Sequence, residues 1–566
     1  MVELGQTWPP KTPSRATGNV QMQEAIRSAT RGVHSNATEV TVRDAVCDLM
    51  RRLGMTTVFG NPGSTELPLF RNFPDDFRYV LGLQEAVVVG MADGYAQATR
   101  NAAFVNLHSA AGVGNAMGNI FTAFKNRTPM VITAGQQARS ILPFDPFLAS
   151  REATELPKPY VKWSIEPARG EDVPHAIARA YYLAMMPPRG PVLVSVPVDD
   201  WDRPAEFSPI RIVSQQVRPD PVVLDQIAQA LDAAVRPVFV VGGAVDRDEA
   251  FDDVVRLAEA HNARVFVAPM TGRCSFPEDH RLFAGFLPAM RERIVSLLAG
   301  ADLVFAIGAP AFTYHVEGSG PHVPTGAKLV QLTDDPGTAS WTPEGVAAVG
   351  SVRLGLVDLL ALTNPPARAL PPARTAAPRA QATSPLSTAY VLQSLAEMRP
   401  AESIIVEEAP SARPVMQAYL PIFSSESFYT MDSGGLGYGM PAAVGVALGK
   451  PGRQVIGVIG DGSSLYSIQS IWSAARLALP ITFVILNNRR YAALQDFAPA
   501  FGFAAQEPVQ GTDLPDLDFV GIATGMGCPA VRVQDAEMLQ AALNSAFASQ
   551  RPMLIDVEVD DRPSSR

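Results

Sequence analysis

Residues 455–491 read VIGVIGDGSSLYSIQSIWSAARLALPITFVILNNRRY, and this stretch decides the fold class. An apolar run ends at Ile459, and the turn Gly460-Asp461-Gly462 follows it. Apolar residues then recur every three to four positions, which predicts a helix that Pro480 closes. A second apolar run ends at Asn487-Asn488. The order strand, helix, strand predicts two neighbouring parallel strands in a sheet that is buried on both faces.

Polar residues at these two strand ends indicate a site for a metal ion and a phosphate group. Parallel strands end at the same edge of a sheet, so Asp461 and Asn488 should lie close together. A carboxylate, an amide oxygen and a nearby backbone carbonyl form an oxygen site that suits Mg²⁺ or Ca²⁺. Gly460 and Gly462 allow the backbone to approach an anion, and the start of the predicted helix offers free N–H groups to it.

Two stretches with few core-forming residues divide the chain. Residues 201–221 mix charge and proline, and residues 363–387 are rich in Pro and Ala, as expected of linkers. They leave the segments 39–205, 216–362 and 385–560, each near the usual size of a domain. Because each segment alternates short apolar runs with helical patterns, we predict an α/β protein with three doubly wound parallel-sheet domains.

Composition and charge exclude several classes of protein. The 46 basic and 56 acidic side chains give a formal net charge of −10, which argues against binding to nucleic acid or to a membrane surface. No apolar run approaches the roughly 18 residues that span a bilayer. Residues 1–38 lack the apolar core of a signal peptide, and we expect a disordered extension there. Cys47, Cys274 and Cys528 form no CxxC pair, which fits a reducing compartment such as the cytoplasm.

A Gly-Asp-Gly turn followed about two dozen residues later by two asparagines is the fingerprint of thiamine-diphosphate enzymes. Together with VFGNPGSTELP (58–68), LQEAVVVGMADGYAQATR (83–100) and GGLGYGMPAAVG (434–445), it makes the chain resemble the decarboxylase branch of that family. The likeness runs from about residue 40 to 559. It implies that the three segments are the pyrimidine-binding, middle and diphosphate-binding domains, in that order. It also implies a homotetramer in which each active site is shared between two chains.

The resemblance implies thiamine diphosphate and Mg²⁺ (or Ca²⁺) as cofactors. Glu85 matches the family's activating glutamate, whose carboxyl group bonds a pyrimidine nitrogen and so helps the cofactor lose the proton from its reacting carbon. The position of Glu85 between two apolar runs predicts that its side chain is buried. Leu436 is expected to hold the cofactor bent, and Gly434 to offer it a carbonyl. The implied metal ligands are Asp461, Asn488 and the carbonyl of Arg490. The other implied cofactor contacts are Ser411, Gly460, Gly462, Ser463 and Tyr491.

Ser64, His108 and His315 match polar residues on the substrate side of the family's site, and each comes shortly after an apolar run. The resemblance implies that Ser64 bonds the substrate carboxylate. The two histidines would move protons, which suits a side chain that titrates near neutral pH. The expected apolar wall is Phe147, Leu148, Ala493, Leu494 and Phe497. Such a wall favours an aromatic 2-oxo acid as the small-molecule substrate, converted to an aldehyde and carbon dioxide.

The sequence departs from the family pattern at three places. Pro410 stands beside Ser411 where a hydroxyl group is expected for the diphosphate. Arg489-Arg490 replaces a glycine and a small residue, and these arginines could neutralise the diphosphate. Thr430 stands where an aromatic pocket residue is expected. Two alternatives therefore stay open. The first is a carboligase of acetolactate-synthase type, or a decarboxylase of another 2-oxo acid, and the second is a non-catalytic homologue.

Overall fold

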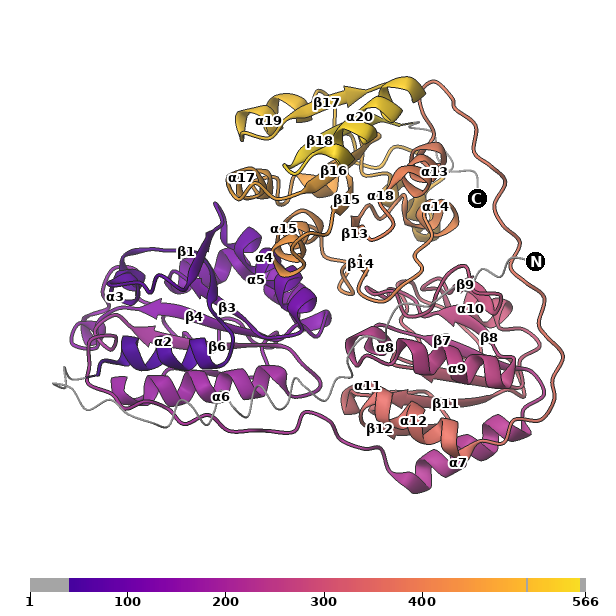
Figure 1. Ribbon diagram of the computed structural model, residues 1–566, viewed down its shortest axis with the longest axis horizontal. Helices are drawn as coiled ribbons and strands as arrows, with labels where there is room; N and C mark the ends of the chain where they lie inside the picture. Colours follow the sequence, from indigo (N-terminus) through magenta and orange to yellow (C-terminus); the bar gives the residue numbers. More distant parts are fainter. Residues whose placement is uncertain (1–39, 505–506, 560–566) are drawn as a thin grey trace, which may run out of the picture. The chain divides into compact units, whose positions relative to one another are not determined.

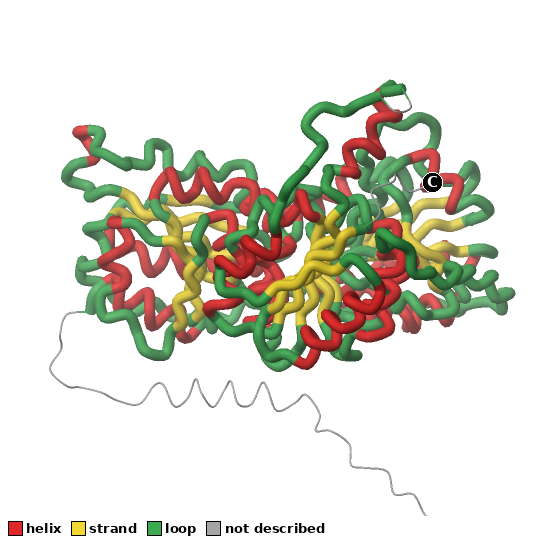
Figure 2. The backbone as a smooth tube through the Cα atoms, turned by 90° about the horizontal axis from the view of Figure 1, so that it is seen from above, coloured by secondary structure: helices red, strands yellow, loops and turns green. Residues whose placement is uncertain are grey.

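The computed structural model describes residues 40–504 and 507–559, so the extension predicted for residues 1–38 lies outside the described residues. The chain forms three six-stranded, all-parallel sheets, each enclosed by helices (Figures 1 and 2). The predicted α/β class with three parallel-sheet domains is confirmed. Within the described residues, no helix has both the length and the apolar character that crossing a bilayer requires.

The first sheet has the strand order β2-β1-β3-β4-β6-β5. Helices α2 and α6 cover one face of it, and α4 and α5 cover the other (Figure 1). Its strands are β1 (Thr57–Asn61), β2 (Arg78–Leu81), β3 (Ala103–Leu107), β4 (Met130–Gln136), β5 (Ser164–Ile165) and β6 (Pro191–Pro197). Its helices include α2 (Val42–Arg52), the one-turn η1 (Ser64–Glu66), α3 (Leu67–Phe70), α4 (Glu85–Thr99), α5 (Ser109–Lys125) and α6 (Val173–Met185).

The middle sheet has the order β12-β11-β10-β7-β8-β9, in which the direction of winding reverses between β10 and β7. Its strands are β7 (Pro237–Val241), β8 (Arg264–Val267), β9 (Phe283–Phe286), β10 (Leu303–Ile307), β11 (Lys328–Thr333) and β12 (Val346–Val349). Its helices are α7 (Pro221–Ala233), α8 (Ala244–Arg247), α9 (Phe251–His261), α10 (Arg291–Leu297), α11 (Pro336–Ser340) and α12 (Val352–Leu362). Beyond α12, residues 363–383 contain no helix or strand, and Arg368 ties them to this domain by donating to the Ala234 carbonyl (2.8 Å).

The third sheet, β14-β13-β15-β16-β18-β17, repeats the strand order of the first. Its strands are β13 (Ile404–Glu408), β14 (Phe428–Tyr429), β15 (Val455–Gly460), β16 (Ile481–Asn487), β17 (Ala530–Val533) and β18 (Met553–Glu558). Its helices are α13 (Thr388–Met398), α14 (Arg413–Tyr419), α15 (Gly439–Gly449), α16 (Asp461–Ser464), α17 (Ser470–Arg476), α18 (Ala492–Phe497), α19 (Phe519–Gly525) and α20 (Ala536–Ala548).

Helices α4 and α15 join the first and third sheets (Figure 1). They approach so closely that a Cβ atom on Gly94 or Gly445 would overlap the backbone of the opposite helix, so only glycine fits at these positions. Asn119 on α5 strengthens the junction, because its Nδ2 donates to the carbonyls of Ala86 (2.6 Å) and Gly437 (3.1 Å). The start of α4, which carries Glu85, is therefore held beside the glycine-rich loop that precedes α15.

The prediction of a single helix after the Gly-Asp-Gly turn is wrong, because the structure has two shorter helices there, α16 and α17. Serine hydroxyls explain the break. Ser464 Oγ donates to the Asp461 carbonyl (2.6 Å), and Ser470 Oγ donates to the Ser467 carbonyl (2.6 Å). Serine side chains that bond nearby carbonyls compete with regular helical pairing.

Candidate active site

Asp461 and Asn488 follow neighbouring strands at the same edge of the third sheet. Strands β15 and β16 are paired in parallel up to Gly460 and Leu486, so the two side chains start from adjacent positions. The Asp461 carboxylate faces the backbone N–H groups of Gly462 and of residues 488–490. Burial raises the pKa of Asp461 to about 6, and these N–H groups partly oppose that rise. The structure therefore brings the predicted metal ligands together.

The polar atoms at this edge fit an oxygen-bound cation. Asp461 Oδ1 accepts from the Gly462 N–H (2.7 Å), whereas the buried Oδ2 has no hydrogen-bond partner among the described residues. A buried carboxylate oxygen without a partner is costly, and a hard cation would satisfy it. Asn488 Oδ1 accepts from the Arg490 N–H (3.2 Å), which brings the Arg490 backbone to the same place. Gly462 must lack a side chain because the Tyr491 ring fills the space where a Cβ atom would lie.

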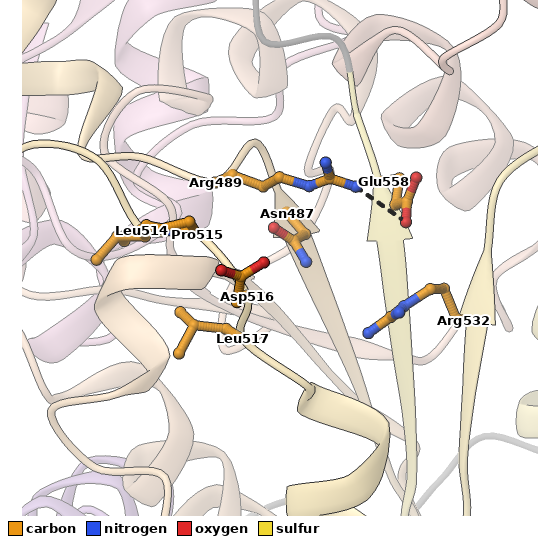
Figure 3. Close-up of a pocket in the computed structure, with 8 residues that line it drawn as sticks. All are labelled: Asn487, Arg489, Leu514, Pro515, Asp516, Leu517, Arg532 and Glu558. Carbon is orange, nitrogen blue, oxygen red and sulfur yellow. Dashed lines mark ion pairs between the residues drawn. The ribbon is translucent and has the colours of Figure 1, made fainter.

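Arg489 and Arg490 direct their side chains differently. Arg489 has φ +60° and extends its guanidinium to Glu558 (3.2 Å), in a pocket that Arg532 and Asp516 also line (Figure 3). Its charge is thus already paired with a carboxylate at the end of β18. The Nε atom of Arg490 is buried and has no hydrogen-bond partner in residues 40–504 and 507–559. Arg490 therefore has a buried donor left for an anion, whereas Arg489 already pairs with Glu558.

The glycine-rich loop before α15 is held by Glu408, a residue that the sequence reading did not single out. Glu408 lies fully buried at the end of β13 and accepts from the N–H groups of Gly437 (2.6 Å) and Gly439. Burial raises the pKa of Glu408 to about 8. The loop itself turns through Gly434 at φ +73° and leaves Leu436 partly buried against the core.

Ser411 and Thr430 follow β13 and β14, at the same edge of the third sheet. Ser411 is partly buried and Pro410 is exposed. The Thr430 hydroxyl donates to the buried Glu407 carboxylate (2.9 Å), which Arg413 also contacts (2.5 Å). Thr430 therefore belongs to a buried polar network, which accounts for a small hydroxyl residue where an aromatic one was expected.

Glu85 is the first residue of α4. Gln84 caps this helix, because its Oε1 accepts from the N–H groups of Ala86 (2.6 Å) and Val87 (3.2 Å). Glu85 Oε2 accepts from Asn115 Nδ2 (3.1 Å). The predicted burial is wrong for the single chain, since the Glu85 side chain is only partly buried. Its position at a helix start leaves one side open to solvent, and a ligand could reach the carboxylate there.

His108 lies at the end of β3, and a buried carboxylate sets its orientation. Its Nδ1 is 2.9 Å from Glu66 Oε2 and 3.1 Å from Thr65 Oγ1. Glu66 also accepts from the Gly63 N–H (2.8 Å) and the Thr65 hydroxyl (2.6 Å). Because an ionised carboxylate only accepts hydrogen bonds, the contact with Glu66 favours a proton on Nδ1 of His108. Ser64, the first residue of η1, is exposed beside this pair.

The residues predicted to form the apolar wall belong to separate places in the single chain. The His315 ring packs against Phe497 of α18, with the ring centroids 4.7 Å apart. Ala493 and Leu494 lie on the same helix, and Leu494 is exposed. Phe147 (84% exposed) and Leu148 lie on a loop of the first domain. The chain thus presents one half-site with Glu85, His108 and Ser64, and another with Asp461, Asn488 and the His315–Phe497 contact.

Profiles of the thiamine pyrophosphate enzyme family match all three domains. The N-terminal TPP binding domain matches residues 40–155, the central domain 224–359, and the C-terminal TPP binding domain 411–557. The chain belongs to the thiamine pyrophosphate enzyme family. It is 45% identical to a benzoylformate decarboxylase of Pseudomonas aeruginosa over 522 residues, which cover 91% of this chain and 98% of that protein.

Solved structures of the same family give the same result. A benzoylformate decarboxylase from Polynucleobacter necessarius superposes with a TM-score of 0.91 at 40% identity, covering 93% of this chain and 99% of the other. The 4-hydroxybenzoylformate decarboxylase of Rhodococcus jostii RHA1 does so with a TM-score of 0.88 at 40% identity, covering 92% and 100%. This thiamine pyrophosphate enzyme is a 2-oxo acid decarboxylase, a carboxy-lyase, as the resemblance predicted.

Proposed function

We propose that this enzyme decarboxylates an aromatic 2-oxo acid such as benzoylformate to the aldehyde and carbon dioxide. The observation that carries the proposal is the His108–Glu66 pair beside Ser64, in the half-site that also holds Glu85. It provides a proton carrier of defined orientation and a hydroxyl group for a carboxylate. The names of the benzoylformate and 4-hydroxybenzoylformate decarboxylases that the chain resembles support the aromatic class of substrate.

The third domain would hold the cofactor through atoms that the fold leaves unpaired. Asp461, Asn488 and the Arg490 carbonyl would bind Mg²⁺, because they offer hard oxygen atoms next to the unsatisfied Asp461 Oδ2. Contacts to the diphosphate would come from Ser411, Gly460, Gly462, Ser463 and Tyr491. Contacts to the rest of the cofactor would come from Gly434 and Leu436. When bound, thiamine diphosphate supplies a carbon nucleophile and a sink for the electrons that carbon dioxide leaves behind.

Each polar residue of the first half-site would have one task. Glu85 holds a proton at the pyrimidine ring, where its partly open carboxyl group is accessible. The Ser64 hydroxyl orients the substrate carboxylate. Glu66 fixes Nδ1–H of His108, so that Nε2 exchanges a proton with the substrate oxygen. In the other half-site, His315, whose ring packs against Phe497, moves the second proton.

A complete site would need two chains, and we propose a homotetramer that provides them. The loop with Phe147 also exposes Phe144 (79%) and Ile141 (41%), which is a large apolar area to leave in water. Covering this loop with the third domain of a second chain would bury the area and bring the two half-sites together. We also propose a cytoplasmic enzyme, since the free thiols Cys47, Cys274 and Cys528 are all buried without a disulfide.

Release of carbon dioxide from a panel of 2-oxo acids tests the substrate class. With benzoylformate, phenylpyruvate, indolepyruvate and pyruvate, we expect the highest kcat/KM for benzoylformate, by about tenfold or more over pyruvate. Preferred turnover of pyruvate, with acetolactate as the product, would support a carboligase instead. Calorimetric titration with thiamine diphosphate and Mg²⁺ tests the cofactor separately, because it does not depend on which substrate is chosen.

A further inference from the structure

A small pocket of the third domain lies next to the loop of the predicted metal ligands, where β16, β17 and β18 end (Figure 3). Its volume is about 230 Å³, below the roughly 300–1,000 Å³ of pockets that take drug-sized ligands, so it suits a smaller molecule. One side is a loop and the other side is polar. The lining residues are Leu514, Pro515, Asp516 and Leu517 from the loop, and Asn487, Arg489, Arg532 and Glu558 from the strand ends.

Two oxygen acceptors of the pocket are unused. The Asp516 side chain makes no hydrogen bond or ion pair within residues 40–504 and 507–559. Asn487 is 7% exposed, and its Nδ2 donates to Asp556 Oδ1 (2.9 Å), which fixes the orientation of the amide. Its Oδ1 accepts no hydrogen bond from the described part of the chain. A carboxylate and an amide oxygen with free lone pairs suit a positively charged donor such as an ammonium group.

The two arginines of the pocket are paired, yet each keeps donors for a carboxylate. Arg532 donates from Nε to Asp556 (3.0 Å) and from Nη2 to Asp518 (3.4 Å). Arg489 contacts Glu558 through Nη2 (3.2 Å). Because a guanidinium group has five N–H donors, these contacts leave several of them open. The lining residues carry two positive and two negative side chains, so a ligand that carries one charge of each sign fits this pocket.

The loop of the pocket is tied to the loop of the predicted metal ligands. The Leu514 N–H donates to the Arg489 carbonyl (2.7 Å), and the Tyr491 N–H donates to the Thr512 carbonyl (2.7 Å). Between these bonds the two loops also pair as an antiparallel bridge. A ligand that holds the first loop therefore also restricts the second, which lowers the cost of ordering that loop when the cofactor binds.

We propose that this pocket binds a free amino acid with an apolar side chain. The ammonium group lies between Asp516 and Asn487 Oδ1, the carboxylate faces Arg532, and the side chain packs against the apolar residues of the loop. Charge-assisted bonds at both ends select a zwitterion. Because the two loops are tied together, the amino acid should also strengthen the binding of thiamine diphosphate. This second effect rests on the proposed function, whereas binding of the amino acid does not.

Calorimetric titration of the full chain with L-leucine, 3-methylbutylamine and 4-methylpentanoate tests the class of ligand. The amine lacks the carboxylate of leucine and the acid lacks its ammonium group, so leucine should bind about tenfold or more tightly than either. Asp516→Asn should weaken the binding of leucine and of the amine about tenfold and leave the acid unchanged. Asparagine tolerates the φ of +60° at this position, so the loop should keep its shape. The matched control Asp252→Asn, at an exposed position on α9, should change nothing.

Arg532→Gln should weaken the binding of leucine and of the acid but not of the amine, with Tm as a check on folding. The proposal is overturned when leucine shows no saturable binding, when either analogue binds as tightly as leucine, or when Asp516→Asn leaves the affinity for leucine unchanged. A crystal structure of the unmodified chain with leucine avoids any folding defect of the variants. It should place the ammonium group beside Asp516, and leucine bound only elsewhere would refute the assignment.

A second titration measures the coupling to the cofactor. Saturating leucine should tighten the binding of thiamine diphosphate, in the presence of Mg²⁺, by about fivefold or more. An unchanged affinity for thiamine diphosphate would overturn the coupling. If leucine binds but thiamine diphosphate does not, the proposed function fails while the amino-acid site stands.

Discussion

Replacing Glu66 by Gln perturbs the orientation of His108 while it keeps the shape of the side chain. Glu66 is 1% exposed, and it accepts from His108 Nδ1, the Gly63 N–H and the Thr65 hydroxyl. The substitution replaces one acceptor oxygen by an NH₂ group and removes the charge. A hydrogen bond to a charged group contributes about 1.5–3 kcal/mol. Loss of the His108 contact alone should therefore lower kcat about 10- to 150-fold.

A double-mutant cycle separates this positioning role from a structural role. His108→Ala should lower kcat more than Glu66→Gln does, and adding Glu66→Gln to His108→Ala should have little further effect. The assay is steady-state decarboxylation of benzoylformate, with circular dichroism and Tm as checks on folding. The exposed Glu171 provides a control, because Glu171→Gln should leave kcat unchanged. If Glu66→Gln lowered kcat by the same factor in the unmodified chain and in the His108→Ala variant, the reasoning would be refuted.

Three further predictions concern the third domain. Asp461→Asn removes the carboxylate whose Oδ2 is unpaired, so calorimetry should show Mg²⁺-dependent binding of thiamine diphosphate weakened by about tenfold or more. Glu408 binds its proton more tightly in the folded chain, where its pKa is about 8, than in the unfolded chain, where it is near the ordinary 4.5. Protonated Glu408 therefore contributes to the free energy of unfolding in full below about pH 4.5, and this contribution is lost as pH rises through 8. In thermal unfolding of the cofactor-free chain, Glu408→Gln should therefore flatten the decline of Tm between pH 5 and pH 8, and an unchanged slope would contradict this. Arg489→Gly should relieve about 1 kcal/mol of left-handed backbone strain and remove an exposed ion pair worth less than about 1 kcal/mol. The free energy of unfolding should therefore change little. A clear loss of affinity for thiamine diphosphate would instead show that Arg489 acts at the diphosphate.

Those parts of the site that depend on strand topology could be predicted from the sequence. Parallel strands end at one edge, so an apolar run followed by Asp461 and another followed by Asn488 were enough to bring these side chains together. The same reasoning put Ser64 and His108 shortly after apolar strands, and the structure shows that these strands, β1 and β3, are neighbours. In each case the spacing of apolar residues, with a period of two in strands and 3.6 in helices, predicts the secondary structure. Short connections then make elements that follow one another in the sequence neighbours in space.

Contacts between side chains do not follow from such periods, and this explains what the sequence reading missed. Glu66 is one of three consecutive polar residues after a strand, and only the turn of η1 selects it, rather than Ser64 or Thr65, as the main partner of His108. Gly63 shows how specific this selection is, because a Cβ atom there would overlap the imidazole. The sequence alone does not show which side chain contacts a given carboxylate. In the structure, the absence of a side chain at Gly63 leaves the space in which the His108 ring lies beside Glu66. The substrate half-site is therefore determined by a close approach of backbone and ring, which no hydrophobic pattern encodes.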